Sequence, residues 1–284
     1  MQPEMSKEFR RDRPSRPSRW TWCGILAATV TIAACEGGMI IAGQNATWGF
    51  VTIAATKSNT GEYRTTPLGQ FFKGALSSVP NAQVVFDSCV PGLSYADAGE
   101  IVGGVNFLDA GPQLELRIGA KSETLPRVTG ATSTTYQKGV AAPVVYTPGD
   151  SIVVTIPGAD GGYPASEIRG KTAEAFTHDP VTPPAGTETI QFRWTPAHDL
   201  NSAMIISMRY AGPTDNNVLR QQILCAFTDD GADSVPFRNH RGWSDSTVKR
   251  REIVFTRLRT SIKAQNEGVL EIISRFQMPT PVLN

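Results

Sequence analysis

The sequence predicts a mostly β protein, an antiparallel β-sandwich of the immunoglobulin-like or jelly-roll-like kind with long loops. Several short segments alternate apolar and polar side chains, which is the period of a half-buried strand. The 284 residues include 26 glycines and 20 prolines, which end strands and form turns. No segment keeps an apolar period of 3.6 residues over three turns, so no helix is expected with conviction.

The first strand is expected at Trp48–Ala55, where the first apolar run of the domain lies. Leu68–Leu76 is ambiguous, and one short helical turn is the alternative there. Ala82–Cys89 is expected to be a strand that ends on its cysteine. Leu93–Phe107 is rich in glycine and small residues, so it is expected to be loop with short strands.

From Gln113 onward the strand pattern is clear. Gln113–Ile118 places three aliphatic side chains on one face and three polar ones on the other. Ser151–Ile156 repeats this pattern, after a turn at Pro148–Asp150 and before the strand-ending pair Pro157-Gly158. Both segments are therefore expected to be half-buried strands.

The second half of the chain contains more short apolar segments separated by turn residues. Asp230-Gly231 predicts a hairpin, and Asn266–Gly268 predicts another. His178–Thr187 holds three prolines and is expected to be a loop. Strands are expected at Val144–Tyr146, Ala173–Phe176, Thr189–Trp194, Met204–Tyr210, Gln222–Phe227, Ile253–Leu258 and Val269–Phe276.

The N-terminal segment has the composition of an export signal. Residues 1–19 are rich in Arg, and residues 20–34 carry no charge. A helix of that uncharged length spans about 22 Å, short of the roughly 30 Å hydrocarbon core of a bilayer. Residues 1–34 are therefore predicted to be a signal peptide, with Met1 and Met5 as alternative starts.

Ile32-Ala33-Ala34-Cys35 ends this apolar run and resembles the lipobox of bacterial lipoproteins. The resemblance implies cleavage before Cys35, lipidation of its sulfur and acylation of its amine. It also implies an exported protein, lipid-anchored to the cell membrane or outer membrane and facing the periplasm or exterior. An uncleaved anchor extended through Met39–Ala42 is the alternative, although Glu36 and a glycine pair interrupt it.

The rest of the chain, about 250 residues, is long enough for a large core. Residues 35–46 are expected to be the lipidated cysteine and a flexible tether. Residues 47–284 are expected to form the β-sandwich, either as one body or as two sub-lobes at about 47–147 and 148–284. Without the basic leader the chain is slightly acidic, which argues against a nucleic-acid partner.

Cys89 and Cys225 are the two cysteines that remain after the signal peptide and Cys35 are set aside. An even pair in an oxidising compartment predicts a disulfide, and two buried thiols are the alternative. The order Cys89, Trp194, Cys225 is analogous to the packing of a tryptophan on an inter-sheet disulfide in immunoglobulin domains, although the spacing is much longer.

Arg238, His240, Trp243 and Asp245 form the densest group of candidate functional side chains. An exposed Trp243 could stack on a sugar ring while its neighbours donate hydrogen bonds. The alternative is that this tryptophan packs into the core. The sequence favours this alternative, and the group is kept as a candidate ligand contact.

Two other groups of residues carry weaker signals. His178-Asp179 and His198-Asp199 could orient a general base or hold a metal, yet adjacent strand residues point to opposite faces. Asp229, Asp230 and Asp233 could bind calcium, but the same residues suit a turn. No catalytic residue, metal site or cofactor is assigned from the sequence.

The sequence favours a lipid-anchored envelope protein that acts as a binding or structural module, and a non-enzymatic role. Its expected partners are the membrane, through the N-terminal lipid, and a glycan or protein of the envelope.

One alternative is an envelope hydrolase acting on glycan or ester through dispersed carboxylate or Ser residues. Such an enzyme would show a carboxylate pair in a cleft or a Ser–His contact. Another alternative is a subunit of a surface or secretion assembly, which would show an apolar patch or an unpaired edge strand.

Overall fold

The computed structural model describes residues 46–74, 87–94, 106–139, 142–181, 188–199, 201–215, 218–248, 250–265 and 268–279. The chain divides into two compact units, Met1–Ile41 and Ala42–Asn284, and every described residue belongs to the second. The signal peptide, the lipidation residue Cys35 and most of the tether of the sequence-based prediction therefore lie outside the described residues.

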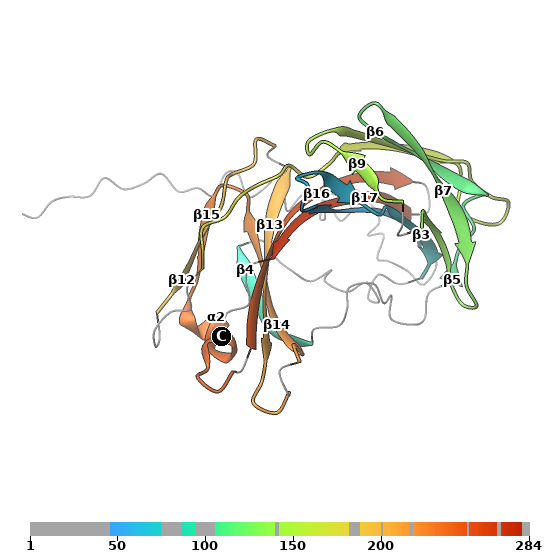
Figure 1. Cartoon of the computed structure of the whole chain (residues 1–284). Coiled ribbons are helices and arrows are strands. Elements are labelled where there is room, and N and C mark those ends of the chain that lie inside the picture. Colours follow the sequence, from blue (N-terminus) through green and yellow to red (C-terminus); the bar gives the residue numbers. More distant parts are fainter. Residues whose placement is uncertain are drawn as a thin grey trace, which may run out of the picture. The chain divides into compact units, whose positions relative to one another are not determined.

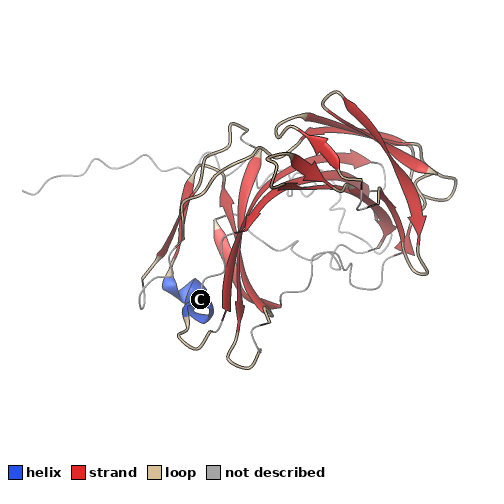
Figure 2. Cartoon of the chain, in the orientation of Figure 1, coloured by secondary structure: helices blue, strands red, loops and turns tan. Residues whose placement is uncertain are grey.

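The described residues are mostly β, which confirms the predicted fold class (Figure 2). They form one large sheet of 15 strands and a small sheet of two. One short helix, α2 (Phe237–Ser244), accompanies them. The strands are β1 (Thr47–Lys57), β2 (Tyr63–Thr65), β3 (Leu68–Lys73), β4 (Ser88–Ser94), β5 (Asn106–Phe107), β6 (Gln113–Ile118), β7 (Lys121–Thr129), β8 (Thr134–Gln137), β9 (Val144–Tyr146), β10 (Ser151–Ile156), β11 (Ser166–Lys171), β12 (Ile190–Arg193), β13 (Ser202–Ala211), β14 (Gln221–Thr228), β15 (Ala232–Val235), β16 (Arg250–Gln265) and β17 (Gly268–Pro279).

The large sheet joins strands that are far apart in the sequence. Its order is β11-β10-β6-β7-β8-β3-β1-β17-β16-β13-β14-β4, with β2, β5 and β9 attached beside this path. Its pairs are antiparallel except β1 with β17, the first and last strands among the described residues, which run parallel. Since β17 pairs with β1 and β10 with β6, the sheet continues across the sub-lobe boundary expected near residue 147.

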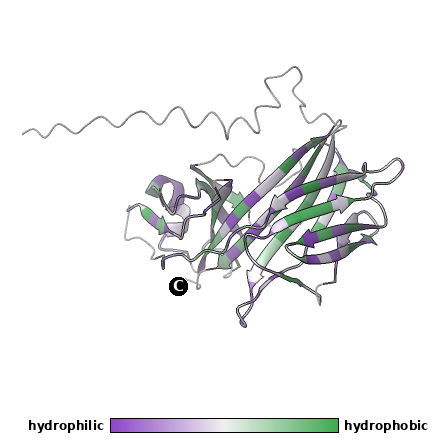
Figure 3. Ribbon diagram, turned by 90° about the horizontal axis from the view of Figure 1, so that it is seen from above, coloured by the Kyte–Doolittle hydropathy of each residue, from purple (hydrophilic) through white to green (hydrophobic). Residues whose placement is uncertain are grey.

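The alternating segments form strands as the sequence predicts. In β6, Leu114, Leu116 and Ile118 are buried, and the residues between them are exposed. In β10, every second side chain is likewise buried. Figure 3 shows hydrophobic and hydrophilic bands following one another along the strands. The buried rows face the core because successive strand side chains point to opposite sides.

β16 and β17 form the hairpin that runs through the middle of the large sheet (Figure 1). Gln265 lies opposite Gly268, and the pairing continues to Val254 opposite Pro279. This register confirms the hairpin predicted at Asn266–Gly268. The first half of β16 also pairs with β13, so the strand belongs to both halves of the core.

One half of the core lies between β11 on one side and β16 and β17 on the other. β11 contacts both of these strands. The backbone N–H of Ala173, just after β11, donates to Ser274 Oγ of β17 at 2.8 Å. Lys263 Nζ of β16 donates to the carbonyl oxygen of Glu167 at 2.9 Å. Part of the same large sheet thus packs over another part, which is a sandwich-like arrangement.

The other half of the core lies beneath the small sheet of β12 and β15, in which Ile190 pairs with Val235. Phe192 of β12 packs edge-on against Phe255 of β16, with ring centroids 5.7 Å apart. Trp194 stacks on Phe227 of β14 at 6.4 Å. α2 packs against β4, β13 and β14 at this end of the domain.

The hairpin predicted at Asp230-Gly231 is wrong. β14 pairs with β13 and β4, whereas β15 pairs with β12, so this turn carries the chain from the large sheet to the small one. Gly231 adopts a φ of 105°, a conformation that suits glycine, and this explains the turn signal. The local chemistry specifies the turn but not the strand that follows it.

Three smaller expectations also need correction. Leu68–Leu76 contains the strand β3 instead of a helical turn. Ala173–Phe176 is irregular, although Ala173 and Phe176 are both buried. α2 is a helix of eight residues that the sequence did not predict, because two turns are too short to establish a period.

In the described ranges, no helix combines the length and apolar content that a bilayer crossing requires.

Candidate binding site

Three chain segments lie side by side above the small-sheet half of the core. The backbone N–H of Asp179 donates to the carbonyl oxygen of Arg193 at 3.0 Å, and that of Thr195 donates to Thr177 at 2.8 Å. The N–H of Trp194 donates to the carbonyl oxygen of Gly231 at 2.9 Å. We call the outward-facing residues of these segments the polar platform: Thr177, Asp179, Arg193, Thr195, Gly231 and Ala232.

Alternation along the segments explains which side chains face outward. His178 and Trp194 form a β-bridge between the segments and point into the core. The His178 ring stacks on Phe255, with centroids 4.2 Å apart and planes 5° from parallel. Since neighbouring residues in an extended chain point to opposite sides, the residues flanking His178 and Trp194 face solvent.

A buried ion pair supports the platform from below. Arg257 Nε donates to Asp229 Oδ2 at 2.6 Å, and the side chains are 0% and 2% exposed. Asp229 Oδ1 also accepts a bond from Trp194 Nε1 at 2.8 Å. Arg257 donates further bonds to the carbonyl oxygens of Thr195 and Ala175. These bonds occupy both carboxylate oxygens and hold the platform segments against β16.

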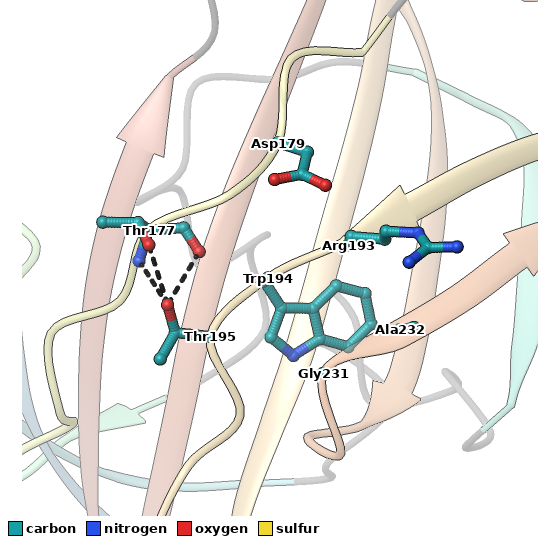
Figure 4. Close-up of a pocket in the computed structure, with 7 residues that line it drawn as sticks. All are labelled: Thr177, Asp179, Arg193, Trp194, Thr195, Gly231 and Ala232. Carbon is teal, nitrogen blue, oxygen red and sulfur yellow. Dashed lines mark hydrogen bonds between the residues drawn. The ribbon is translucent and has the colours of Figure 1, made fainter.

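The platform encloses a depression of about 330 Å³ that is open to solvent. On one side, the hydroxyls of Thr177 and Thr195 lie 2.7 Å apart (Figure 4). Asp179 and Arg193 contribute a carboxylate and a guanidinium, and within the described part of the chain neither side chain has a hydrogen-bond partner. Gly231 and Ala232 add little side-chain bulk to the lining, which also includes Trp194. The depression thus offers acceptors, donors and hydroxyls that a ligand can reach.

Of the four residues predicted as a ligand contact, only two are exposed. Trp243 and His240 are both 0% exposed, whereas Arg238 and Asp245 are exposed. Trp243 offers no sugar-stacking face because α2 turns this indole into the core, which is the alternative that the sequence favoured. A ligand contact through Arg238 and Asp245 stays a prediction.

His240 makes a Ser–His contact inside this helix. Its Nε2 lies 3.0 Å from the carbonyl oxygen of Glu188, and its Nδ1 lies 2.7 Å from Ser244 Oγ. A carbonyl can only accept, so Nε2 carries the proton and Nδ1 accepts the bond from Ser244. Burial lowers the pKa of His240, which keeps the ring neutral in this arrangement.

The surroundings of Ser244 favour a structural role for this contact. Ser244 is the last residue of α2, where a helix presents carbonyl oxygens instead of N–H groups. Arg251, the neighbouring cation, donates to the carbonyl oxygens of Trp243 and Asp245 at 2.7 and 2.6 Å. An acyl-transfer site needs free donors for the developing oxyanion, and these donors are already engaged.

The other candidate pairs of the sequence are separated by the fold. Asp199 pairs with Arg259 at 2.7 Å, while His198 turns to Glu174 on the surface. Asp229 is engaged by Arg257, so it is not available to a calcium ion with Asp230 and Asp233. Among the residues that the structure describes, no three His, Cys, Asp or Glu side chains gather in a metal-binding group.

Cys89 and Cys225 form a disulfide, as predicted. They lie directly opposite each other on the paired strands β4 and β14, with Cα atoms 4.0 Å apart. Cys225 is buried in the core, and Cys89 packs against the core from the edge strand. The bridge joins positions 136 residues apart in the chain.

Sequence reasoning missed most of the platform. It noted Asp179 only as the partner of His178, and it did not mark Thr177, Arg193 or Thr195. The alternation of Thr189–Trp194 does place Arg193 opposite the core-facing Trp194, which was a usable signal.

Comparisons of the chain with protein-family models, curated proteins and solved structures found no match.

Proposed function

We propose that this chain is a lipid-anchored envelope protein whose β domain binds a ligand at the polar platform. The observation that carries the binding role is the pair of unpartnered, opposite charges, Asp179 and Arg193, on a hydrogen-bonded framework. Because neither side chain has a protein partner, a ligand can take its hydrogen bonds without breaking one that is already made.

The export part of the proposal rests on the apolar segment that ends in Ile32-Ala33-Ala34-Cys35. The Cys89–Cys225 disulfide supports it, because such bonds persist in oxidising compartments such as the bacterial periplasm. Two acyl chains or more hold a protein stably at a membrane, whereas one binds only marginally. A thioether lipid with an acylated amine meets that requirement.

Fractionation of cells tests the anchor. Globomycin, which blocks the lipoprotein signal peptidase, should make the precursor accumulate, and Cys35→Ala should release the protein from membranes. Cys23→Ala is the matched control and should leave the distribution unchanged. Unaltered fractionation of both the treated protein and Cys35→Ala would refute the anchor.

A hydrolase acting on esters is the second candidate, and the Ser244–His240 contact is the observation that favours it. The full chain should then react with a fluorophosphonate probe, and Ser244→Ala should abolish the labelling. Ser207→Ala, which changes a serine of β13, is the control. We expect no labelling at Ser244, because the carbonyl-rich end of α2 cannot stabilise an oxyanion.

The edges of the large sheet give less support to an assembly subunit. β4 carries Pro91, which has no N–H to offer a further strand, and Gly92 with a φ of 72°. β11 exposes Glu167, Arg169 and Lys171 at the opposite edge. Prolines and charges at edges oppose strand addition, so we do not adopt this function.

A further inference from the structure

We propose that the polar platform binds a neutral sugar ring, with Asp179 accepting and Arg193 donating hydrogen bonds to neighbouring hydroxyls. This inference rests on the proposed binding role and names the chemical class of the ligand.

The charges of the platform disfavour an ion as the ligand. An anion such as phosphate would be attracted by Arg193 but repelled by Asp179, and a cation would meet the reverse situation. The remaining lining residues, Thr177, Thr195, Gly231, Ala232 and Trp194, carry no charge. An uncharged ligand meets neither repulsion, and its hydroxyl groups can still form hydrogen bonds to both charged side chains.

The hydrogen-bonding groups suit a polyol. The Asp179 carboxylate only accepts, the Arg193 guanidinium only donates in a flat fork, and the threonine hydroxyls do either. A sugar ring presents adjacent hydroxyls that each donate and accept, so it can satisfy all three kinds of group at once. A purely apolar ligand would satisfy none of them.

A peptide strand is a poorer fit, because the backbone of the platform is already paired. Asp179 N–H and Arg193 C=O bond to each other, as do Thr195 N–H and Thr177 C=O. Strand addition depends on free main-chain groups at a sheet edge. Recognition at the platform must therefore go through side chains, as recognition of hydroxyl groups does.

The size and openness of the site indicate one or two rings of a longer chain. Its volume of about 330 Å³ lies at the lower end of the roughly 300–1,000 Å³ that ligand pockets occupy. Thr177, Asp179, Arg193 and Thr195 are all exposed, so a polysaccharide can continue past the depression in either direction. Trp194 is only 5% exposed and offers no stacking face, so we expect weak binding through hydrogen bonds alone.

The framework beneath orders the backbone that carries the recognition groups. Asp229 accepts from both Arg257 and Trp194, and Arg257 donates to the backbone of Thr195. The ordered backbone loses little conformational entropy on binding, whereas the exposed side chains of Asp179 and Arg193 still have to be fixed by the ligand. The order of the backbone offsets part of the weakness of a site without an aromatic stack.

Calorimetric titration of the full chain in detergent micelles tests the proposal. The probes are maltohexaose, cellohexaose, mannohexaose and hexa-N-acetylchitohexaose, which are all uncharged and differ in linkage, in hydroxyl stereochemistry or in N-acetyl substitution. We expect saturable binding of at least one of them. Asp179→Asn and Arg193→Gln should each weaken that binding by about tenfold, which corresponds to one lost hydrogen bond to a charged group.

Glu115→Gln and Arg117→Gln are the matched controls, because these residues are an exposed acid and an exposed base two positions apart on β6. They should bind the probe as the unaltered chain does. Absence of binding by all four probes would overturn the proposal, as would equal binding by platform and control variants. Cys35→Ala fractionation is scored separately, so loss of the sugar site and loss of the anchor are distinguishable.

Discussion

Arg257 donates hydrogen bonds to both carboxylate oxygens of Asp229, at 2.6 and 2.9 Å, inside the core of the domain. Arg257 also lies over the ring of Phe176, with its guanidinium carbon 5.0 Å from the centroid. The pair connects β16, the end of β14 and the platform segments. Such a pair costs desolvation, and its hydrogen bonds offset that cost only while both partners are present.

Removal of one partner of this pair should therefore be far more harmful than removal of both. We expect Asp229→Ala to lower the free energy of unfolding by about 3–5 kcal/mol, because it leaves the Arg257 charge buried and unpaired. The double variant Asp229→Leu with Arg257→Met should be considerably more stable than Asp229→Ala. Urea denaturation checks this, and a double variant as unstable as the single one would contradict it.

The disulfide should stabilise the domain mainly through the unfolded chain. For a loop of over 100 residues, the chain-entropy argument predicts about 4–5 kcal/mol. Replacement of Cys89 and Cys225 by Ala should lower the free energy of unfolding by up to that amount. A reducing agent should lower the melting temperature of the unaltered protein and leave that of the double variant unchanged, as measured by calorimetry.

Glu271 should make stability depend on pH. Burial raises its pKa from the ordinary value of 4.5 to about 7, so the folded protein binds its proton more tightly than the unfolded chain. The ionised Glu271 carboxylate destabilises the fold. The free energy of unfolding should therefore fall as pH rises from about 4.5 to 7, and it should level off above pH 7.

The variant Glu271→Gln isolates this contribution. Its unfolding free energy, measured by urea denaturation at pH 5, 6 and 8, should decline less over this range than that of the unaltered protein. The difference between the two proteins should reach a few kcal/mol at pH 8, since one pKa unit corresponds to about 1.4 kcal/mol. Parallel pH profiles for the two proteins would contradict the assignment.

Gly49 of β1 allows close packing between the layers of the first half-core. A Cβ at this position would lie 2.8 Å from the hydroxyl of Tyr163 and 2.9 Å from Phe71. Gly49→Ala should therefore destabilise the domain by about 1–3 kcal/mol through overpacking. Gly139→Ala is the control, because a Cβ there meets nothing within 4 Å. Equal melting temperatures for the two variants would show that the layers can move apart.

Several features of the fold were predictable because they depend on neighbours in the sequence. The period-two alternation of Gln113–Ile118 and Ser151–Ile156 specifies which side of each strand faces the core. The turn residues at Asn266–Gly268 specify the hairpin of β16 and β17. The disulfide was predictable by counting, since the predicted signal peptide and lipidation site would account for Cys23 and Cys35 and leave Cys89 and Cys225.

Other features depend on which segments meet, and local patterns do not contain this information. The turn at Asp230-Gly231 looks like a hairpin, yet β15 pairs with β12, whose Phe192 packs on Phe255 of β16. The indole of Trp243 was a candidate binding surface until α2 placed it in the core. Here tertiary packing overrides the local signal.

The sequence alone determined the β class, the faces of its clearest strands and the cysteine pair, because periodicity and composition act over a few residues. Tertiary structure decided that the first and last strands run side by side, and that Arg257 finds Asp229. It also brought Asp179 and Arg193 together as one platform. The physical reason is that such long-range pairings are selected by the joint burial of apolar surface and the hydrogen bonding of buried polar groups, and both depend on the whole chain at once.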